Sequence, residues 1–211
     1  MSEYLSDAEQ KQQIVDWWNE NGKFIVTGVG LGLVAIFAWR GWTAYLDKQA
    51  GAASIVFEDM VTAVNEGESD TAKNHLSTLT DKYKSTAYYP HAQMLMAKVA
   101  LESGNLADAA TALEQAISTS KDAELTELAN FRLAKVYLAQ QNFDAALTTI
   151  AKVKSESYIP LVEELRGDIF RAQGNINDAR FAYEKAQTAM LETPIGDPNL
   201  LQMKLSDLGK K

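Results

Sequence analysis

The sequence predicts an all-α protein, in which a single N-terminal transmembrane helix is followed by a solenoid of repeated helix pairs. Two observations lead to this fold class. The stretch Phe24–Trp39 contains no charged residue, and three later stretches repeat one pattern of turn, small and large residues. No stretch shows the strict alternation that is typical of a strand, and Ser54–Phe57 fits a helical face better.

Residues 1–21 are expected to form a short acidic tail. This tail carries five carboxylates against Lys11 alone. Trp17 and Trp18 suit the interface between water and lipid, where tryptophan is enriched. The alternative interpretation is a disordered acidic tail.

The predicted transmembrane helix spans about residues 22–44. Its uncharged core of 16 residues would be about 24 Å long as a helix, against a hydrocarbon core of about 30 Å. Lys23 and Arg40 can extend their long side chains to the headgroups, and Gly41–Leu46 continues the apolar run. The flanking residues therefore complete the span.

A cleaved signal peptide is the competing interpretation, because Ala50–Ala52 resembles a small-residue cleavage site. The acidic tail and the distance from Trp39 to Ala52 both oppose it. Gly28 and Gly32 form a GxxxG pattern that would let a second membrane helix approach closely. The alternative is that glycine is simply common in membrane helices. Lysine and arginine are balanced on the two sides of the span, so they do not predict its orientation.

Composition excludes several classes of function. The net charge of −8 argues against nucleic acid as a partner, because phosphate binding needs an excess of lysine and arginine. The chain has no cysteine and only two histidines, which excludes thiolate chemistry and a histidine-rich metal site. No catalytic constellation appears, so we expect neither an enzyme nor a cofactor. Glu163, Glu164 and Asp168 are interpreted as a solvated helix face near Arg166 and Arg171.

Three stretches after the anchor align with one another. Each begins with a Gly-Asn or Gln-Asn turn. A small residue follows five positions after the first residue of the turn, and a large residue follows nine positions after it. These stretches are Gly104–Ala116, Gln141–Val153 and Gly174–Ala186. Helical segments precede the turns at Ala92–Ser103, Leu125–Gln140 and Pro160–Gln173. This is the tetratricopeptide helix–turn–helix pattern.

The positions within each repeat have a physical explanation. The small residues let two helices approach closely, the large ones fill the space between pairs, and glycine favours the positive φ of the turn. The small residues are Ala109, Ala146 and Ala179, and the large ones are Leu113, Ile150 and Tyr183.

A weaker first repeat comprises helices Ala53–Asn65 and Asp70–Tyr83, and a capping helix is expected at about 198–208. Residues 45–211 therefore form the predicted repeat domain, with turns near 67, 104, 141 and 174.

The candidate binding surface is the concave face, which the first helix of each pair would form. Apolar residues interleaved with mixed charges suit extended polypeptide. The alternative is that Phe57, Met94 and Phe131 are core between repeats. The residues assigned to this face are Phe57, Val61, Met94, Lys98, Phe131, Lys135, Glu164, Asp168 and Arg171.

The order of these features resembles the YfgM family, the ancillary subunit of the SecYEG translocon of proteobacteria. The resemblance rests on Trp17–Lys23, Trp39–Trp42, Arg132–Val136 and Leu165–Asp168 in their order along the chain. It implies a bacterial inner-membrane protein with a cytoplasmic N-terminus, one span and a periplasmic repeat domain.

The resemblance also implies partners and a role. The partners would be the SecYEG translocon, a PpiD-type membrane-anchored periplasmic chaperone, translocating polypeptides and the lipid bilayer. The role would be a non-enzymatic scaffold or co-chaperone that passes newly translocated proteins to periplasmic chaperones. The alternative is a regulator whose cytoplasmic tail binds a soluble stress-response signalling protein.

Overall fold

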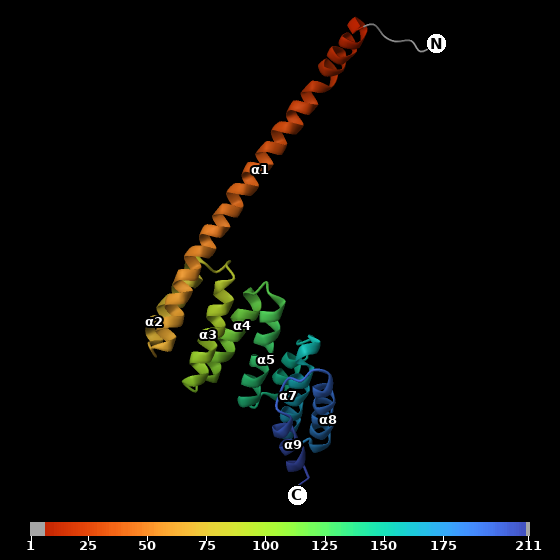
Figure 1. Cartoon of the computed structure of the whole chain (residues 1–211). Coiled ribbons are helices and arrows are strands. Elements are labelled where there is room, and N and C mark those ends of the chain that lie inside the picture. Colours follow the sequence, from red (N-terminus) through yellow and green to blue (C-terminus); the bar gives the residue numbers. More distant parts are fainter. Residues whose placement is uncertain (1–6, 210–211) are drawn as a thin grey trace, which may run out of the picture. The chain divides into compact units, whose positions relative to one another are not determined.

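The structure, a computed structural model, describes residues 7–209. Within this range every regular element is a helix (Figure 1), which confirms the all-α prediction. The elements are α1 (Asp7–Asn65), α2 (Ser69–Lys82), α3 (Tyr88–Glu102), α4 (Leu106–Thr119), α5 (Ala123–Ala139), α6 (Phe143–Ile150), the short 3₁₀ helix η1 (Glu156–Tyr158), α7 (Ile159–Ala172), α8 (Ile176–Glu192) and α9 (Pro198–Asp207).

The chain divides into two units, Met1–Gln49 and Ala50–Lys211. Residues 1–6 of the expected tail lie outside the described residues. The described part of the first unit is helical throughout, because α1 begins at Asp7 and ends beyond this unit, at Asn65.

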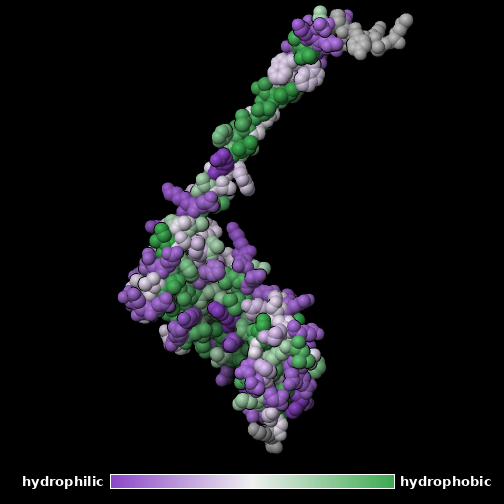
Figure 2. All heavy atoms as spheres, in the orientation of Figure 1, coloured by the Kyte–Doolittle hydropathy of each residue, from purple (hydrophilic) through white to green (hydrophobic). Residues whose placement is uncertain are grey.

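The apolar stretch of α1 has the character of a membrane span. An 18-residue window of this helix has a mean hydropathy of 1.7, and only 6% of that window is buried. Phe24 and Phe37 are 79% and 71% exposed, and Figure 2 shows the stretch as a run of green, apolar side chains. Apolar exposure this continuous would be unfavourable in water, so α1 is long and apolar enough to cross a bilayer. The limits at 22–44 stay a prediction.

In the second unit the helices follow one another as packed neighbours from α2 to α9. Within residues 50–209, four clusters of buried apolar side chains lie along the array instead of one central core. The first cluster joins the end of α1 to α2 and α3 through Met60, Leu79 and Tyr89. This arrangement is typical of repeat proteins, in which each repeat contacts only its neighbours.

The turns between paired helices have the predicted conformation. Gly67, Gly104 and Gly174 have φ angles of 79°, 74° and 82°. Gln141 occupies the equivalent place in the third repeat with φ of 60°, although a side chain makes this region less favourable than it is for glycine. Asn142 then caps α6, because its side chain accepts a hydrogen bond from the backbone N–H of Ala145 at 3.3 Å.

The expected small and large positions of the repeats are all fully buried. Ala109, Ala146, Ala179, Leu113, Ile150 and Tyr183 each have 0% exposure. Two predicted helix starts were wrong: the helix expected to begin at Ala53 is the end of α1, which begins at Asp7, and α3 begins at Tyr88 rather than Ala92. The helix starts earlier because Tyr89 and Pro90 are buried in its first turn, where proline is tolerated.

Candidate protein-binding groove

A groove of about 430 Å³ lies between α3 and α5, the first helices of two successive pairs. We call the side of the repeat domain formed by the end of α1, α3, α5 and α7 the first-helix face. The residues that line the groove are Met94, Ala97, Lys98, Leu101, Leu113, Arg132, Lys135, Val136 and Ala139.

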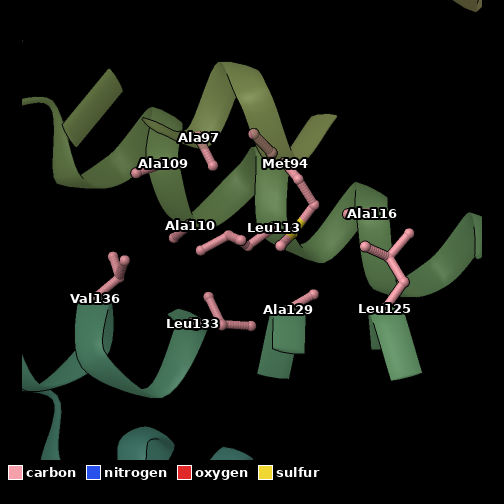
Figure 3. Packing of buried hydrophobic residues seen from close by; sticks show 11 residues of the cluster. Met94, Ala97, Ala109, Ala110, Leu113, Ala116, Leu125, Ala129, Leu133 and Val136 are labelled. Carbon is pink, nitrogen blue, oxygen red and sulfur yellow. The ribbon is translucent and has the colours of Figure 1, made fainter. Parts of the chain in front are cut away.

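The floor of the groove is apolar and buried. Met94, Leu113 and Val136 come from α3, α4 and α5, and their exposures are 6%, 0% and 2%. They belong to one cluster of buried side chains that point toward one another between these helices (Figure 3). Leu101 on α3 is 42% exposed, so the groove offers a bound chain accessible apolar surface above a packed base.

The rim of the groove is basic. Lys98 lies 3.6 Å from Glu102 in an exposed pair, which contributes little to stability. The Lys135 ammonium lies 5.9 Å from the centre of the Phe131 ring. No carboxylate of residues 7–209 lies within 4.0 Å of the charged groups of Arg132 or Lys135.

Two aromatic residues of the first-helix face take part in packing between helices. Phe57 is half-buried, with its ring centre 5.8 Å from that of Tyr88. Phe131 is also half-buried, and its ring centre lies 6.1 Å from that of Tyr158. Together with the buried Met94, these residues support the face from within, as the core interpretation expects. Val61 is half-buried as well.

The carboxylates of α7 are not a solvated face, so that interpretation was wrong. Lys204 of α9 donates hydrogen bonds to Glu164 at 2.6 Å and to Asp168 at 2.8 Å. The three side chains are only 15%, 13% and 22% exposed. These two acids of the first-helix face therefore hold the C-terminal helix in place. Arg171, one turn further along α7, is exposed.

Glu163 is likewise buried rather than solvated. Its carboxylate accepts hydrogen bonds from Lys185 at 2.9 Å and from Arg166 at 3.3 Å, so α7 and α8 are joined by an ion pair on the other side of α7.

Tyr183 joins the same two helices at the point where Gly167 leaves room for its ring. The phenol donates a hydrogen bond to Asp168 at 2.8 Å. Burial, together with this hydrogen bond, raises the pKa of Tyr183 well above its usual range. The tyrosine therefore stays neutral as a hydrogen-bond donor.

The comparisons with known proteins match the whole of this architecture. The family model for the tetratricopeptide repeat-like domain matches residues 15–210. The Escherichia coli protein named "Ancillary SecYEG translocon subunit" is 30% identical over 211 residues, covering 99% of both chains. The chain belongs to the family of ancillary SecYEG translocon subunits.

Relatives with the same name occur in other bacteria. The Haemophilus influenzae protein is 30% identical, covering 99% of this chain and 100% of its own. The Neisseria gonorrhoeae protein is 26% identical, with 99% and 100% covered. Membership in this family of translocon subunits identifies the chain as a non-enzymatic repeat scaffold. The predicted family and fold class are thereby confirmed.

The candidate membrane span of α1 is a second surface of interest. Gly28 and Gly32 lie on α1, and a Cβ atom added at either would meet no atom within 4 Å. Both positions are therefore open to a neighbouring helix.

Six of the nine residues that line the groove of this translocon-subunit homologue were not assigned to it from the sequence, among them Leu101 and Arg132. Arg132 was noted only as part of a motif, and Leu101 was not singled out. The sequence spacing could have predicted both residues. Leu101 lies three residues after Lys98, and Arg132 lies three before Lys135, so each shares a helix face with that lysine.

Proposed function

We propose that this chain is a non-enzymatic, membrane-anchored scaffold at the SecYEG translocon, where it binds newly translocated polypeptide and helps pass it to periplasmic chaperones. The printed names of its relatives support an association with the Sec translocon. The apolar stretch of α1 supports a place in the bacterial inner membrane. The handover of polypeptide is the further step of the proposal.

The observation that carries the proposal is the groove between α3 and α5. An unfolded segment presents both apolar and polar groups, and a binding site for it needs accessible apolar surface beside groups that can form hydrogen bonds. Leu101 supplies the accessible apolar surface, while Lys98, Arg132 and Lys135 supply donors at the rim. A buried base keeps the groove open without a bound chain, which lowers the entropic cost of binding.

Photo-crosslinking from the groove tests this function. We expect a photoreactive residue at Leu101 to capture translocating chains or translocon components in membranes. The matched control is Thr111, an exposed residue of α4 outside the groove. Equal capture from both positions, or capture from neither, would refute the assignment of the groove to polypeptide.

The proposed orientation has a cytoplasmic N-terminus and a periplasmic repeat domain. Protease added to spheroplasts should then degrade residues 50–209, whereas protection of this segment would overturn the orientation. Deleting residues 1–20 tests the scaffold against the regulator described above. The scaffold should keep most of its function without this segment, and the regulator should lose it.

We further propose that α1 contacts membrane partners through Gly28 and Gly32, among them a PpiD-type membrane-anchored chaperone. Gly28→Leu combined with Gly32→Leu should lower the recovery of such complexes after mild solubilisation, because two large side chains prevent close helix approach. Gly30→Leu is the control, since Gly30 lies on another side of the helix. Unchanged recovery of the double variant would reduce α1 to a tether.

A further inference from the structure

The groove between α3 and α5 differs in charge from the chain as a whole. The chain carries a net charge of −8, yet all three ionisable residues that line the groove are basic. They are Lys98 on α3, and Arg132 and Lys135 on α5.

Two of these cations have no ionic partner in the part of the chain that the structure describes. Among residues 7–209, neither Arg132 nor Lys135 forms an ion pair, and Lys98 has only the exposed contact with Glu102 at 3.6 Å. Because residues three apart on a helix are neighbours, Arg132 and Lys135 present their charges to the same side of α5. Their positive charge is therefore available to a ligand.

Two acids that the sequence places on the first-helix face do not compensate this charge. Glu164 and Asp168 both bind Lys204, and all three side chains are at most 22% exposed. The exposed Glu102 offsets Lys98 alone, so Arg132 and Lys135 leave the lining of the groove with a net positive charge.

We propose that the groove selects acidic segments of polypeptide that also carry apolar side chains. An apolar side chain of the segment lies on Leu101 and the Met94 floor, while its carboxylates pair with Arg132 and Lys135. This proposal rests on the assignment of the groove to polypeptide under Proposed function and adds the charge of the segment that is bound.

Physical considerations favour this ligand. Arginine offers a planar set of donors that matches a carboxylate with two parallel hydrogen bonds. An apolar floor beneath the cations lowers the local dielectric and strengthens their field in the groove. The same cations repel lysine-rich and arginine-rich segments, so the groove discriminates by repulsion as well as by attraction.

The test measures peptide binding to the full chain in mild detergent by fluorescence anisotropy. The probes are three short fluorescein-labelled peptides in which leucine alternates with aspartate, asparagine or lysine. We expect the aspartate peptide to bind at least about tenfold more tightly than the lysine peptide at about 0.1 M salt. The preference should shrink at about 1 M salt, where the screening length falls to about 3 Å.

Two variants with opposite consequences accompany the wild type. Arg132→Glu combined with Lys135→Glu should weaken binding of the aspartate peptide about tenfold and improve binding of the lysine peptide. The matched control is Lys82→Glu with Lys152→Glu, which changes the net charge equally at two exposed positions outside the groove. This control should leave both affinities within about twofold of wild type.

Leu101→Ser separates this proposal from the proposed function on which it rests. If Leu101→Ser weakens all three peptides but none is preferred by charge, the groove binds polypeptide and the acidic selectivity is wrong. If neither Leu101→Ser nor the double charge reversal changes any affinity, the groove is not the polypeptide site at all. Competition by vesicles of an anionic phospholipid, without a preference among the peptides, would assign the cations to lipid headgroups and overturn the proposal.

Discussion

A methyl group added at Gly167 tests whether the contact between α7 and α8 is as tight as the structure shows. In Gly167→Ala the new Cβ atom would lie 2.3 Å from both Cδ1 and Cε1 of the Tyr183 ring. Carbon atoms in ordinary contact are about 3.5–4.0 Å apart, so the overlap exceeds about 1 Å. Tyr183 has 0% exposure, and its ring has no solvent-filled space into which to move.

Three terms determine the expected loss of stability. Overpacking of this kind costs about 1–3 kcal/mol. Displacement of the ring also weakens the hydrogen bond from the Tyr183 hydroxyl to Asp168, which contributes about 1 kcal/mol. Alanine recovers about 1 kcal/mol through its higher helix propensity. The net decrease in the free energy of unfolding should be about 2 kcal/mol.

Urea denaturation followed by circular dichroism measures this loss, and hydrogen exchange locates it. With a slope of about 2 kcal/mol per M, the midpoint should fall by about 1 M, and exchange should increase first in α7 and α8. Gly51→Ala is the control, since Gly51 also lies within a helix but its added Cβ meets no atom within 4 Å. It should be neutral or slightly stabilising.

Equal stability of Gly167→Ala and the Gly51→Ala control would show that the contact between α7 and α8 is not tight. A double-mutant cycle makes the test independent of general damage. In a Tyr183→Ala background the methyl group at position 167 has no ring to displace, so it should cost at least about 1 kcal/mol less than in the wild type. Equal costs in the two backgrounds would show that the ring is not what the methyl group meets.

Three further predictions follow from contacts between helices. Lys204→Met should release α9 and lower the free energy of unfolding by about 2 kcal/mol, because it leaves two poorly exposed carboxylates of α7 without their cation. Limited proteolysis should then cut near the C-terminus, and unchanged resistance would show that Lys204 does not hold α9 in place. The hydrogen bond to Glu114, at 2.5 Å, and burial raise the pKa of Tyr137 to about 12 from its ordinary value of about 10. The neutral phenol should therefore stabilise the fold fully below about pH 10, and this stabilisation should disappear as the pH rises to about 12. Across this range the urea midpoint of the wild type should fall, and that of Tyr137→Phe should fall less. Glu127→Gln should loosen the segment after α6, since the carboxylate accepts a hydrogen bond from the backbone N–H of Ser155 at 3.1 Å. The Ser155 amide should exchange faster, because the free energy of local opening falls by about 1 kcal/mol.

Local patterns in the sequence account for most of the fold. The uncharged stretch Phe24–Trp39 indicated a membrane helix because each of its residues is apolar or small. The turns at Gly104 and Gly174 were predictable because a positive φ strongly favours glycine. Buried positions such as Ala146 and Ile150 followed from the repeat register.

The charged contacts were less predictable, because they join residues distant in sequence. Lys204 lies 40 and 36 positions from its two partners on α7, and no local spacing reveals such a pair. Without it, Glu164 and Asp168 were indistinguishable from surface acids. Lys98 and Lys135 were assigned to a face of mixed charge, so the basic character of the rim was not predicted. The role of Arg132 depends on how closely α3 and α5 approach each other.

The separate clusters of buried side chains have a mechanical consequence. A protein with one central core resists a pulling force until the whole core breaks, but here each cluster is closed mainly by the helices next to it. Under tension between the ends of the repeat domain, the helix pairs should yield one after another, each extending the domain by a step while the others stay folded. We therefore expect the domain to lengthen in steps under load and to shorten again when the load is removed.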